Sequence, residues 1–165
     1  MYPCKRGGAL RNRAMARLFL ATIAMAFAAG NATASPGVNV GAGVDDPING
    51  EHVGVFTVSY LTNDRFPWEF GVGWFSPHDS PTTDQPAPGT YYLDVSRRLT
   101  WHHLFASAGL VYDTANDRVL SGHYQIQSAL GLTYGPCTLS VRHMSNADTY
   151  GTNHGESFAL FEYGF

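Results

Sequence analysis

The feature that most constrains this fold is a series of eight short segments in which apolar and polar residues alternate. Alternation with a period of two places successive side chains on opposite faces of a β-strand. Glycine is frequent, and no segment carries a long apolar stripe at helical spacing, so an all-β fold is expected. The predicted strands cover residues 37–44, 52–61, 68–76, 90–98, 104–112, 123–134, 138–145 and 157–165.

The connections between these segments alternate in length. The short ones are 62–67, 99–103 and 135–137, and the longer, more polar ones are 45–51, 77–89, 114–120 and 146–156. Short turns at one end and longer loops at the other are typical of outer-membrane barrels. The sequence therefore predicts an eight-stranded antiparallel transmembrane β-barrel with residues 77–89 outside the cell. A soluble β-sandwich or a secreted lipocalin-like barrel is the alternative that composition alone leaves open.

The first 34 residues have the organisation of a secretory signal peptide. Basic residues precede an apolar run at 18–30, and Ala32-Thr33-Ala34 has the small-x-small pattern of a cleavage site. The apolar run is shorter than the roughly 20 residues of a membrane-spanning helix. We therefore expect residues 1–34 to be removed and residues 35–165 to form a single barrel domain.

Removal of the signal would change the charge and the cysteine content of the chain. The mature chain would keep five Arg, no Lys and all 13 acidic residues, a formal charge of about −8. This balance argues against nucleic acid as a partner, because phosphate binding requires a basic surface. Cys137 would be the one remaining cysteine, so no intramolecular disulfide is expected.

The last two segments each divide into two faces of different chemistry. The face of Phe165 carries no charge and is expected to meet lipid, whereas the face of Glu162 is expected to line the interior. Arg142 in lipid would cost roughly 2–4 kcal/mol near the bilayer midplane, so it is expected inside, paired with Glu162 or another interior acid. His143 and Ser145 then share the outward face, close to the last long loop.

An imidazole beside a hydroxyl is the smallest unit of an activated nucleophile. On the outer surface of a barrel, His143 and Ser145 would require a substrate that resides in the membrane. Most His-x-Ser pairs are incidental, however, and polar groups that lie among lipid headgroups cost little. A catalytic dyad and a small structural or adhesion barrel with two incidental polar residues are both compatible with the spacing.

A resemblance to a known family extends over the last two segments. It rests on the run Arg-His-Met-Ser-Asn-Ala at 142–147, on Asn153-x-Gly155 and on the aromatic-ended last strand. In these features, residues 142–165 resemble the lipid A 3-O-deacylase family (PagL-like), and the rest of the chain is similar in architecture and length. The resemblance implies an eight-stranded barrel of the bacterial outer membrane that hydrolyses the 3-position ester-linked acyl chain of lipid A.

The resemblance also implies a reaction type and partners. The enzyme would be a serine esterase without a cofactor, acting on lipid A or lipopolysaccharide in the membrane. Whether it forms a homodimer is left open. Carried over by position, Ser145 is expected to be the nucleophile and His143 the general base. Asn146 is expected either to help bind the oxyanion or to shape the loop, and Asn153 is a second oxyanion candidate.

Two residues compete for the place of the family's acid. Strict alternation from Phe165 puts Ser157 outward and Glu156 inward, unless a bulge at Gly155 turns Glu156 outward. We favour Glu156, because orienting an imidazole and stabilising its cation calls for a carboxylate. Asp148 is a further candidate.

Two other kinds of site receive less support. The remaining histidines show no metal-ligand spacing, so no metal is expected. An outer-membrane phospholipase also uses a His-x-Ser-Asn run, but that family has a larger barrel and a calcium requirement, and this chain is short for it.

Overall fold

The computed structural model of the chain describes residues 36–45, 53–80, 85–116, 119–151, 153 and 155–165. The predicted signal peptide lies outside the described residues. Among the described residues, no helix is long and apolar enough to cross a membrane.

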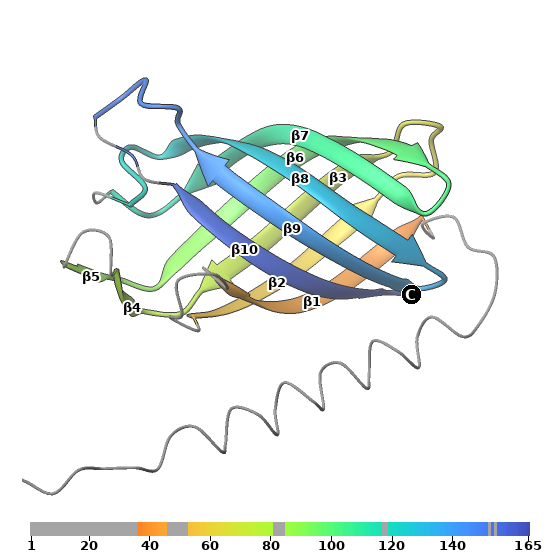
Figure 1. The fold of residues 1–165 in the computed structure, drawn as a ribbon, viewed down its shortest axis with the longest axis horizontal. Coiled ribbons are helices and arrows are strands. Elements are labelled where there is room, and N and C mark those ends of the chain that lie inside the picture. Colours follow the sequence, from red (N-terminus) through yellow and green to blue (C-terminus); the bar gives the residue numbers. More distant parts are fainter. Residues whose placement is uncertain (1–35, 46–52, 81–84, 117–118, 152, 154) are drawn as a thin grey trace, which may run out of the picture. The chain divides into compact units, whose positions relative to one another are not determined.

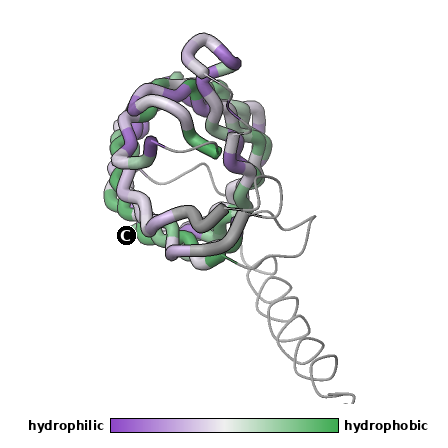
Figure 2. Tube along the Cα trace, turned by 90° about the vertical axis from the view of Figure 1, so that its left-hand side faces the viewer, coloured by the Kyte–Doolittle hydropathy of each residue, from purple (hydrophilic) through white to green (hydrophobic). Residues whose placement is uncertain are grey.

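Eight antiparallel strands close into a barrel, as the sequence predicts (Figure 1). They are β1 (Gly37–Asp45), β2 (Val53–Leu61), β3 (Trp68–Phe75), β6 (Thr90–Trp101), β7 (Leu104–Asp113), β8 (Tyr124–Tyr134), β9 (Cys137–Ser145) and β10 (Glu156–Gly164). Each strand pairs with its neighbours along the chain, and β1 pairs with β10 to close the ring. Figure 2 shows this ring from one end.

The connection 77–89 contains strand residues that the sequence did not predict. It contains two short strands, β4 (His78–Ser80) and β5 (Gln85–Ala87), which form a separate two-stranded sheet. The abundance of proline there indicates a loop, but the alternation signal of three-residue strands is too short to be recognised in a sequence.

The two ends of the barrel differ, as the connection lengths predict. One end carries the turns 62–67, 102–103 and 135–136, and we call it the turn end. The other carries the longer connections 46–52, 76–89, 114–123 and 146–155, and we call it the loop end. In Figure 1, the turn end lies on the right and the loop end on the left.

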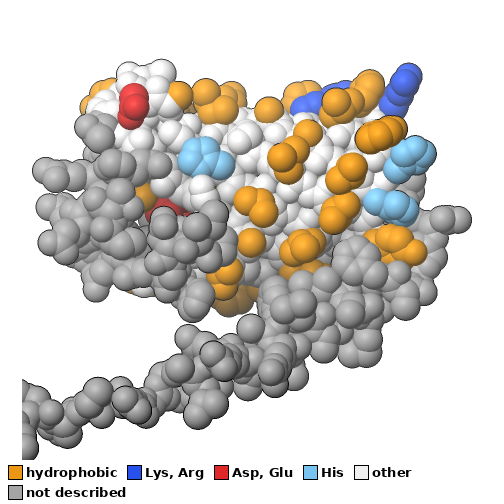
Figure 3. All heavy atoms as spheres, viewed as in Figure 1, with side chains coloured by type: hydrophobic (Ala, Val, Ile, Leu, Met, Phe, Trp, Pro, Cys, Tyr) orange, Lys and Arg blue, Asp and Glu red, His pale blue; other side chains and the backbone are white. Residues whose placement is uncertain are grey.

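The outer surface of the barrel is largely apolar. Exposed large hydrophobic side chains occur on all eight strands, among them Val38, Val40, Phe56, Val58, Phe70, Val72, Leu93, Val95, Leu110, Ile126, Leu130, Val141 and Tyr163. Figure 3 shows hydrophobic side chains over the central part of one face. A soluble monomer rarely exposes a continuous apolar surface of this extent. The pattern is that of a barrel surrounded by lipid.

The interior nearer the loop end is filled by aromatic side chains. The ring centroids of Phe75 and Phe158 lie 5.1 Å apart, and those of Phe75 and Tyr92 lie 5.2 Å apart. Met144 and Leu160 belong to the same buried cluster. Close packing of large side chains in a small barrel leaves a solid core rather than a pore.

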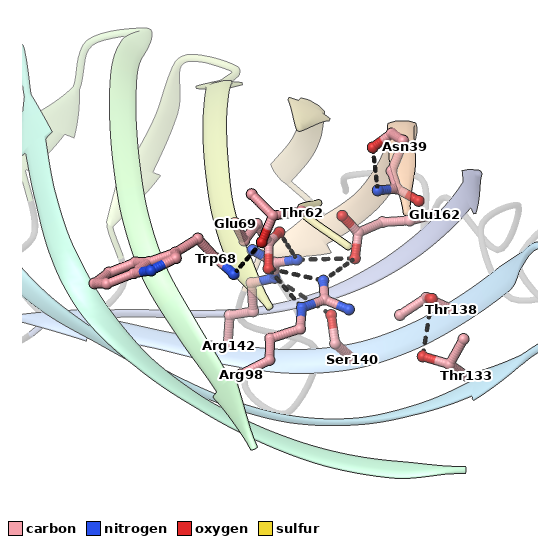
Figure 4. Close-up of polar contacts among 11 residues, drawn as sticks. Asn39, Thr62, Trp68, Glu69, Arg98, Thr133, Thr138, Ser140, Arg142 and Glu162 are labelled. Carbon is pink, nitrogen blue, oxygen red and sulfur yellow. Dashed lines mark hydrogen bonds and ion pairs between the residues drawn. The ribbon is translucent and has the colours of Figure 1, made fainter. Parts of the chain in front are cut away.

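Nearer the turn end, the interior holds a buried ion network (Figure 4). Arg142 Nη2 lies 2.8 Å from both Glu69 Oε1 and Glu162 Oε2, and Arg98 Nη2 lies 2.7 Å from Glu69 Oε2. The predicted inward orientation of Arg142 and its pairing with Glu162 are confirmed, and Glu69 is an additional partner. Because losing one partner of a buried ion pair is costly, this network holds β9 rigidly against β3 and β10.

Candidate active site

One histidine and two serine side chains lie near one another on the outer surface of β9 and β10. Burial alternates along β9, where Arg142 and Met144 are buried, His143 is exposed and Ser145 is half-buried. In the antiparallel register, His143 lies directly opposite Ser157 of β10, whose side chain is also exposed. The predicted outward orientation of His143 and Ser145 is therefore confirmed.

His143 is held by a hydroxyl group. Its Nδ1 lies 2.8 Å from Ser157 Oγ, within hydrogen-bonding distance. A partner on one ring nitrogen sets the orientation of the imidazole and leaves the other nitrogen, Nε2, for chemistry. Ser157 thus occupies the position relative to the histidine that a carboxylate takes in a Ser-His-Asp triad.

The expected position of Glu156 is wrong. Glu156 lies opposite Met144 and is buried, so it points into the barrel rather than toward His143. Gly155 has a φ of 70°, but the alternation of β10 is already regular at Glu156, and no bulge turns this side chain outward. Strict alternation decides the orientation, because the paired strand β9 fixes the pleat of β10. Asp148 lies in the loop beyond β9, where its Oδ1 accepts a hydrogen bond from Asn153 N–H at 3.1 Å.

Ser145 ends β9 at the start of a tight turn. Its Oγ accepts a hydrogen bond from Ala147 N–H at 3.1 Å, and Ala147 and Asp148 both have left-handed φ values, 53° and 57°. Among the described contacts, Ser145 Oγ has no hydrogen bond to His143. A nucleophile–base hydrogen bond is often long in an unliganded site and shortens when substrate binds.

Asn146 and Asn153 are not oriented toward the nucleophile. The buried Asn146 Nδ2 donates to Ser121 O at 2.7 Å and to Tyr150 O at 2.9 Å. The buried Asn153 Nδ2 donates to Gln125 Oε1 at 3.0 Å. The Asn146 amide therefore joins the 146–155 loop to the 114–123 loop, and the Asn153 amide joins the 146–155 loop to β8. Of the two expectations for Asn146, the structure supports the loop-shaping one.

Gly155, which the sequence suggested only as the place of a bulge, packs against the site itself. A Cβ at this position would lie 2.8 Å from His143 Cε1 and 3.0 Å from Ser145 Cβ. The backbone of Gly155 thus packs directly against both polar side chains, and its φ of +70° independently favours glycine. The Gly at the end of Asn-x-Gly was a signal that could have identified it.

Substitution of Gly155 by Ala should impair the site. The methyl group would press on Met144 O, 2.7 Å away on β9, as well as on His143 and Ser145. We expect activity to fall roughly tenfold, because small misplacements of catalytic groups are costly. Gly151→Ala is the matched control, since Gly151 has a φ of +68° but its nearest contact is Ser121 Oγ at 3.4 Å. Equal losses of activity in the two variants would point to backbone strain and not to displacement of the site.

A shallow hollow on the outer surface adjoins His143. It has a volume of about 410 Å³ and runs over β7, β8 and β9. Ala106 and Ser128 keep it open because their side chains are small, and the exposed Leu130 and Val141 give it apolar walls. Because Ser128 pairs with His143 and Leu130 pairs with Val141, the hollow extends from His143 away from the loop end. Its apolar walls offer contacts to a hydrocarbon chain.

The residues that the structure describes contain no cluster of three or more His, Cys, Asp or Glu side chains able to hold a metal ion. The reactive groups at the site of His143, Ser145 and Ser157 are hydroxyl and imidazole groups. The fold and the site together define a class: an eight-stranded β-barrel with an apolar exterior and a His–Ser group on that exterior.

No family model matches the chain, and no curated protein matches it. Among solved structures, the chain is similar to one described as the crystal structure of the outer membrane enzyme PagL. The TM-score is 0.49 and the sequence identity is 12%, over 78% of this chain and 99% of that chain.

Proposed function

We propose that this chain is a serine esterase of the bacterial outer membrane that removes the 3-position ester-linked acyl chain from lipid A. Residues 1–34 would direct export and be removed, and the loop end would face the cell exterior. One observation carries the proposal: His143 is hydrogen-bonded to Ser157 and lies beside Ser145 on the lipid-facing surface. These side chains belong neither to the buried aromatic cluster nor to the interior ion network, so their arrangement is not needed to hold the barrel together.

The position of Ser145 and His143 on the barrel determines which substrates they can reach. Ser145 and His143 lie at the loop end of β9, so in the proposed orientation they face the outer leaflet. A substrate whose ester lies at headgroup depth could place its carbonyl at Ser145 and its acyl chain in the hollow beside His143. Lipid A is an acylated lipid of that leaflet, and the family resemblance of residues 142–165 points to its 3-position ester.

The mechanism follows from the hydrogen bonds of His143 and Ser145. In the productive tautomer, Nδ1–H of His143 donates to Ser157 Oγ, so Nε2 carries the lone pair. Ser145 Oγ accepts from Ala147 N–H, which leaves its own proton for His143 Nε2. Ser145 Oγ then attacks the ester carbonyl, and His143 gives the proton to the leaving sugar oxygen, which departs as a hydroxyl. Water, deprotonated by His143, hydrolyses the acyl-serine and releases the fatty acid.

Backbone amides are the candidates for stabilising the oxyanion. Ala147 N–H is held in place by the tight turn after β9, and it would have to transfer its 3.1 Å hydrogen bond from Ser145 Oγ to the developing oxyanion. Removal of a single oxyanion donor typically slows an enzyme by roughly 10²–10³-fold, so a donor on a fixed loop is valuable. Asn146 braces this loop through Ser121 and Tyr150, which gives its side chain a supporting role.

Mass spectrometry of lipids treated with the refolded protein tests the proposal. Loss of one 3-position acyl chain from lipid A would support it. Release of lysophospholipid from phospholipid vesicles, with lipid A unchanged, would instead indicate a phospholipase. If neither lipid changes under conditions where the barrel is folded, the chain is a non-enzymatic barrel and the proposal is wrong.

Blocking the hollow should affect long acyl chains selectively. In Ala106→Trp, the indole would fill the hollow beside Leu130, its register partner. We expect roughly tenfold lower kcat/KM for a long-chain ester and little change for an acetyl ester, since lost apolar contact is worth about 0.8 kcal/mol per methylene. Val58→Trp on the exterior of β2 is the control. Equal losses for the long and acetyl esters would show that the hollow does not hold the acyl chain.

A further inference from the structure

The exposed arginines among the described residues gather at the turn end of the barrel. Arg98 and Arg142 are buried in the interior network, whereas Arg65 and Arg97 are exposed. Arg65 lies in the 62–67 turn, and Arg97 lies on the outward face of β6 near its turn end. In Figure 3, the Lys and Arg side chains of the visible face lie along its upper edge, toward the right.

Both guanidinium groups are held against aromatic rings. Arg97 Cζ lies 4.6 Å from the centroid of the Trp68 ring, and Arg65 Cζ lies 5.3 Å from that of Phe66. Trp68 lies directly opposite Arg97 in the pairing of β3 and β6, so the strand register brings the two side chains together. Stacking leaves the N–H groups at the edge of each guanidinium available to an acceptor.

These two arginines have no carboxylate partner among the described residues, where the ion pairs join Arg98 and Arg142 to interior acids. Charge on the outside of a membrane barrel is unfavourable unless it lies near the interface or meets an opposite charge. The neighbouring outward residues Phe70, Val95 and Leu99 are apolar and exposed. A ligand here would need a negatively charged head beside the arginines and an apolar part along these residues.

A hollow at the same end offers further donors. It has a volume of about 590 Å³ and lies between the turns after β2 and β6. Arg65, Asn63, Thr100 and His102 line it. Asp64 also lines it, and its carboxylate accepts a hydrogen bond from Thr62 Oγ1 at 2.9 Å. Arg65 thus lines a recess that holds several hydrogen-bond donors, and its guanidinium stacks on Phe66.

We infer that the turn end binds the phosphate of an anionic phospholipid in the leaflet that faces it. Arg65 and Arg97 would contact the phosphate, and the acyl chains would lie along Phe70, Val95 and Leu99. Local complementarity is required, because the whole chain has a formal charge of −3 and offers no general attraction to anions. The inference rests on the membrane placement in the proposed function and not on esterase activity, so either can fail without the other.

Native mass spectrometry of the refolded chain in detergent tests this site. Phosphatidylglycerol and phosphatidylcholine with the same acyl chains are added separately, and bound lipids are counted. We expect phosphatidylglycerol to bind preferentially, and Arg65→Gln/Arg97→Gln to weaken its binding roughly tenfold without affecting phosphatidylcholine. Esterase activity on lipid A in neutral detergent should be unchanged, since both arginines lie at the opposite end from Ser145.

A second double variant controls for net charge. Asn116→Asp/Tyr150→Glu lowers the formal charge by the same amount at the loop end, where Asn116 and Tyr150 are exposed. It should retain phosphatidylglycerol binding. Equal binding of both lipids by the unmodified chain, equal losses in the two double variants, or full competition by inorganic phosphate would each overturn the inference.

Discussion

Ser145→Ala and His143→Ala should each reduce hydrolysis of the lipid A ester by at least roughly 10³-fold. The two side chains act as one unit, because the imidazole has no proton to accept once the hydroxyl is gone. The double variant should therefore be only slightly less active than either single variant. Initial rates of fatty acid release from purified lipid A give the measurement.

The folded state should survive these substitutions. Ser145 and His143 project from the outer surface and belong neither to the aromatic cluster nor to the ion network. Faster migration of unboiled protein on a gel reports the intact barrel. Substantial turnover by Ser145→Ala in a folded barrel would end its assignment as the nucleophile.

Ser157→Ala should lower activity roughly 10²-fold, the second largest effect. The variant loses the 2.8 Å hydrogen bond to His143 Nδ1, so the ring is free to adopt the wrong orientation or tautomer. Ser157→Thr keeps a hydroxyl group at this position and should restore most of the activity. Rescue by Thr separates a positioning role from simple loss of packing.

Glu156→Gln is the matched comparison at the adjacent position. Glu156 faces the barrel interior, so replacing it with an isosteric amide should change kcat/KM far less than Ser157→Ala. Stability of the barrel is measured in parallel, because a buried residue can affect folding. A large loss of activity in folded Glu156→Gln, with near-normal Ser157→Ala, would reverse the assignment.

A neutral partner for the histidine has a chemical consequence. An aspartate or glutamate beside an imidazole stabilises the imidazolium that forms during attack, whereas a hydroxyl only orients the ring. Ser157 therefore predicts a slower enzyme than one with a carboxylate in this place. The exposed position of His143 lessens this difference, because surrounding water and headgroups also solvate the cation.

Much of the barrel was predictable because strand alternation is a local property. Each strand needs only its own period of two to assign inward and outward faces, which is why Arg142 and His143 were placed correctly. The charge of Arg142 was decisive, since one strongly polar residue settles the orientation of a whole strand. The same rule put Glu162 on the interior face of the last strand, but it did not decide which interior acid pairs with Arg142, and Glu69 is a partner as well.

The identity of the residue beside His143 was decided only in three dimensions. The sequence determined that His143 and Ser145 face outward and that Glu156 and Ser157 face opposite ways. It left open a bulge at Gly155, because a bulge depends on how β10 pairs with β9 and not on local residues. Contacts between segments remote in the chain place Ser157 against His143. Contacts of the same kind join Asn146 to the 114–123 loop and Asn153 to Gln125 of β8. Such contacts depend on the closure of the whole barrel, and no local pattern in the sequence records them.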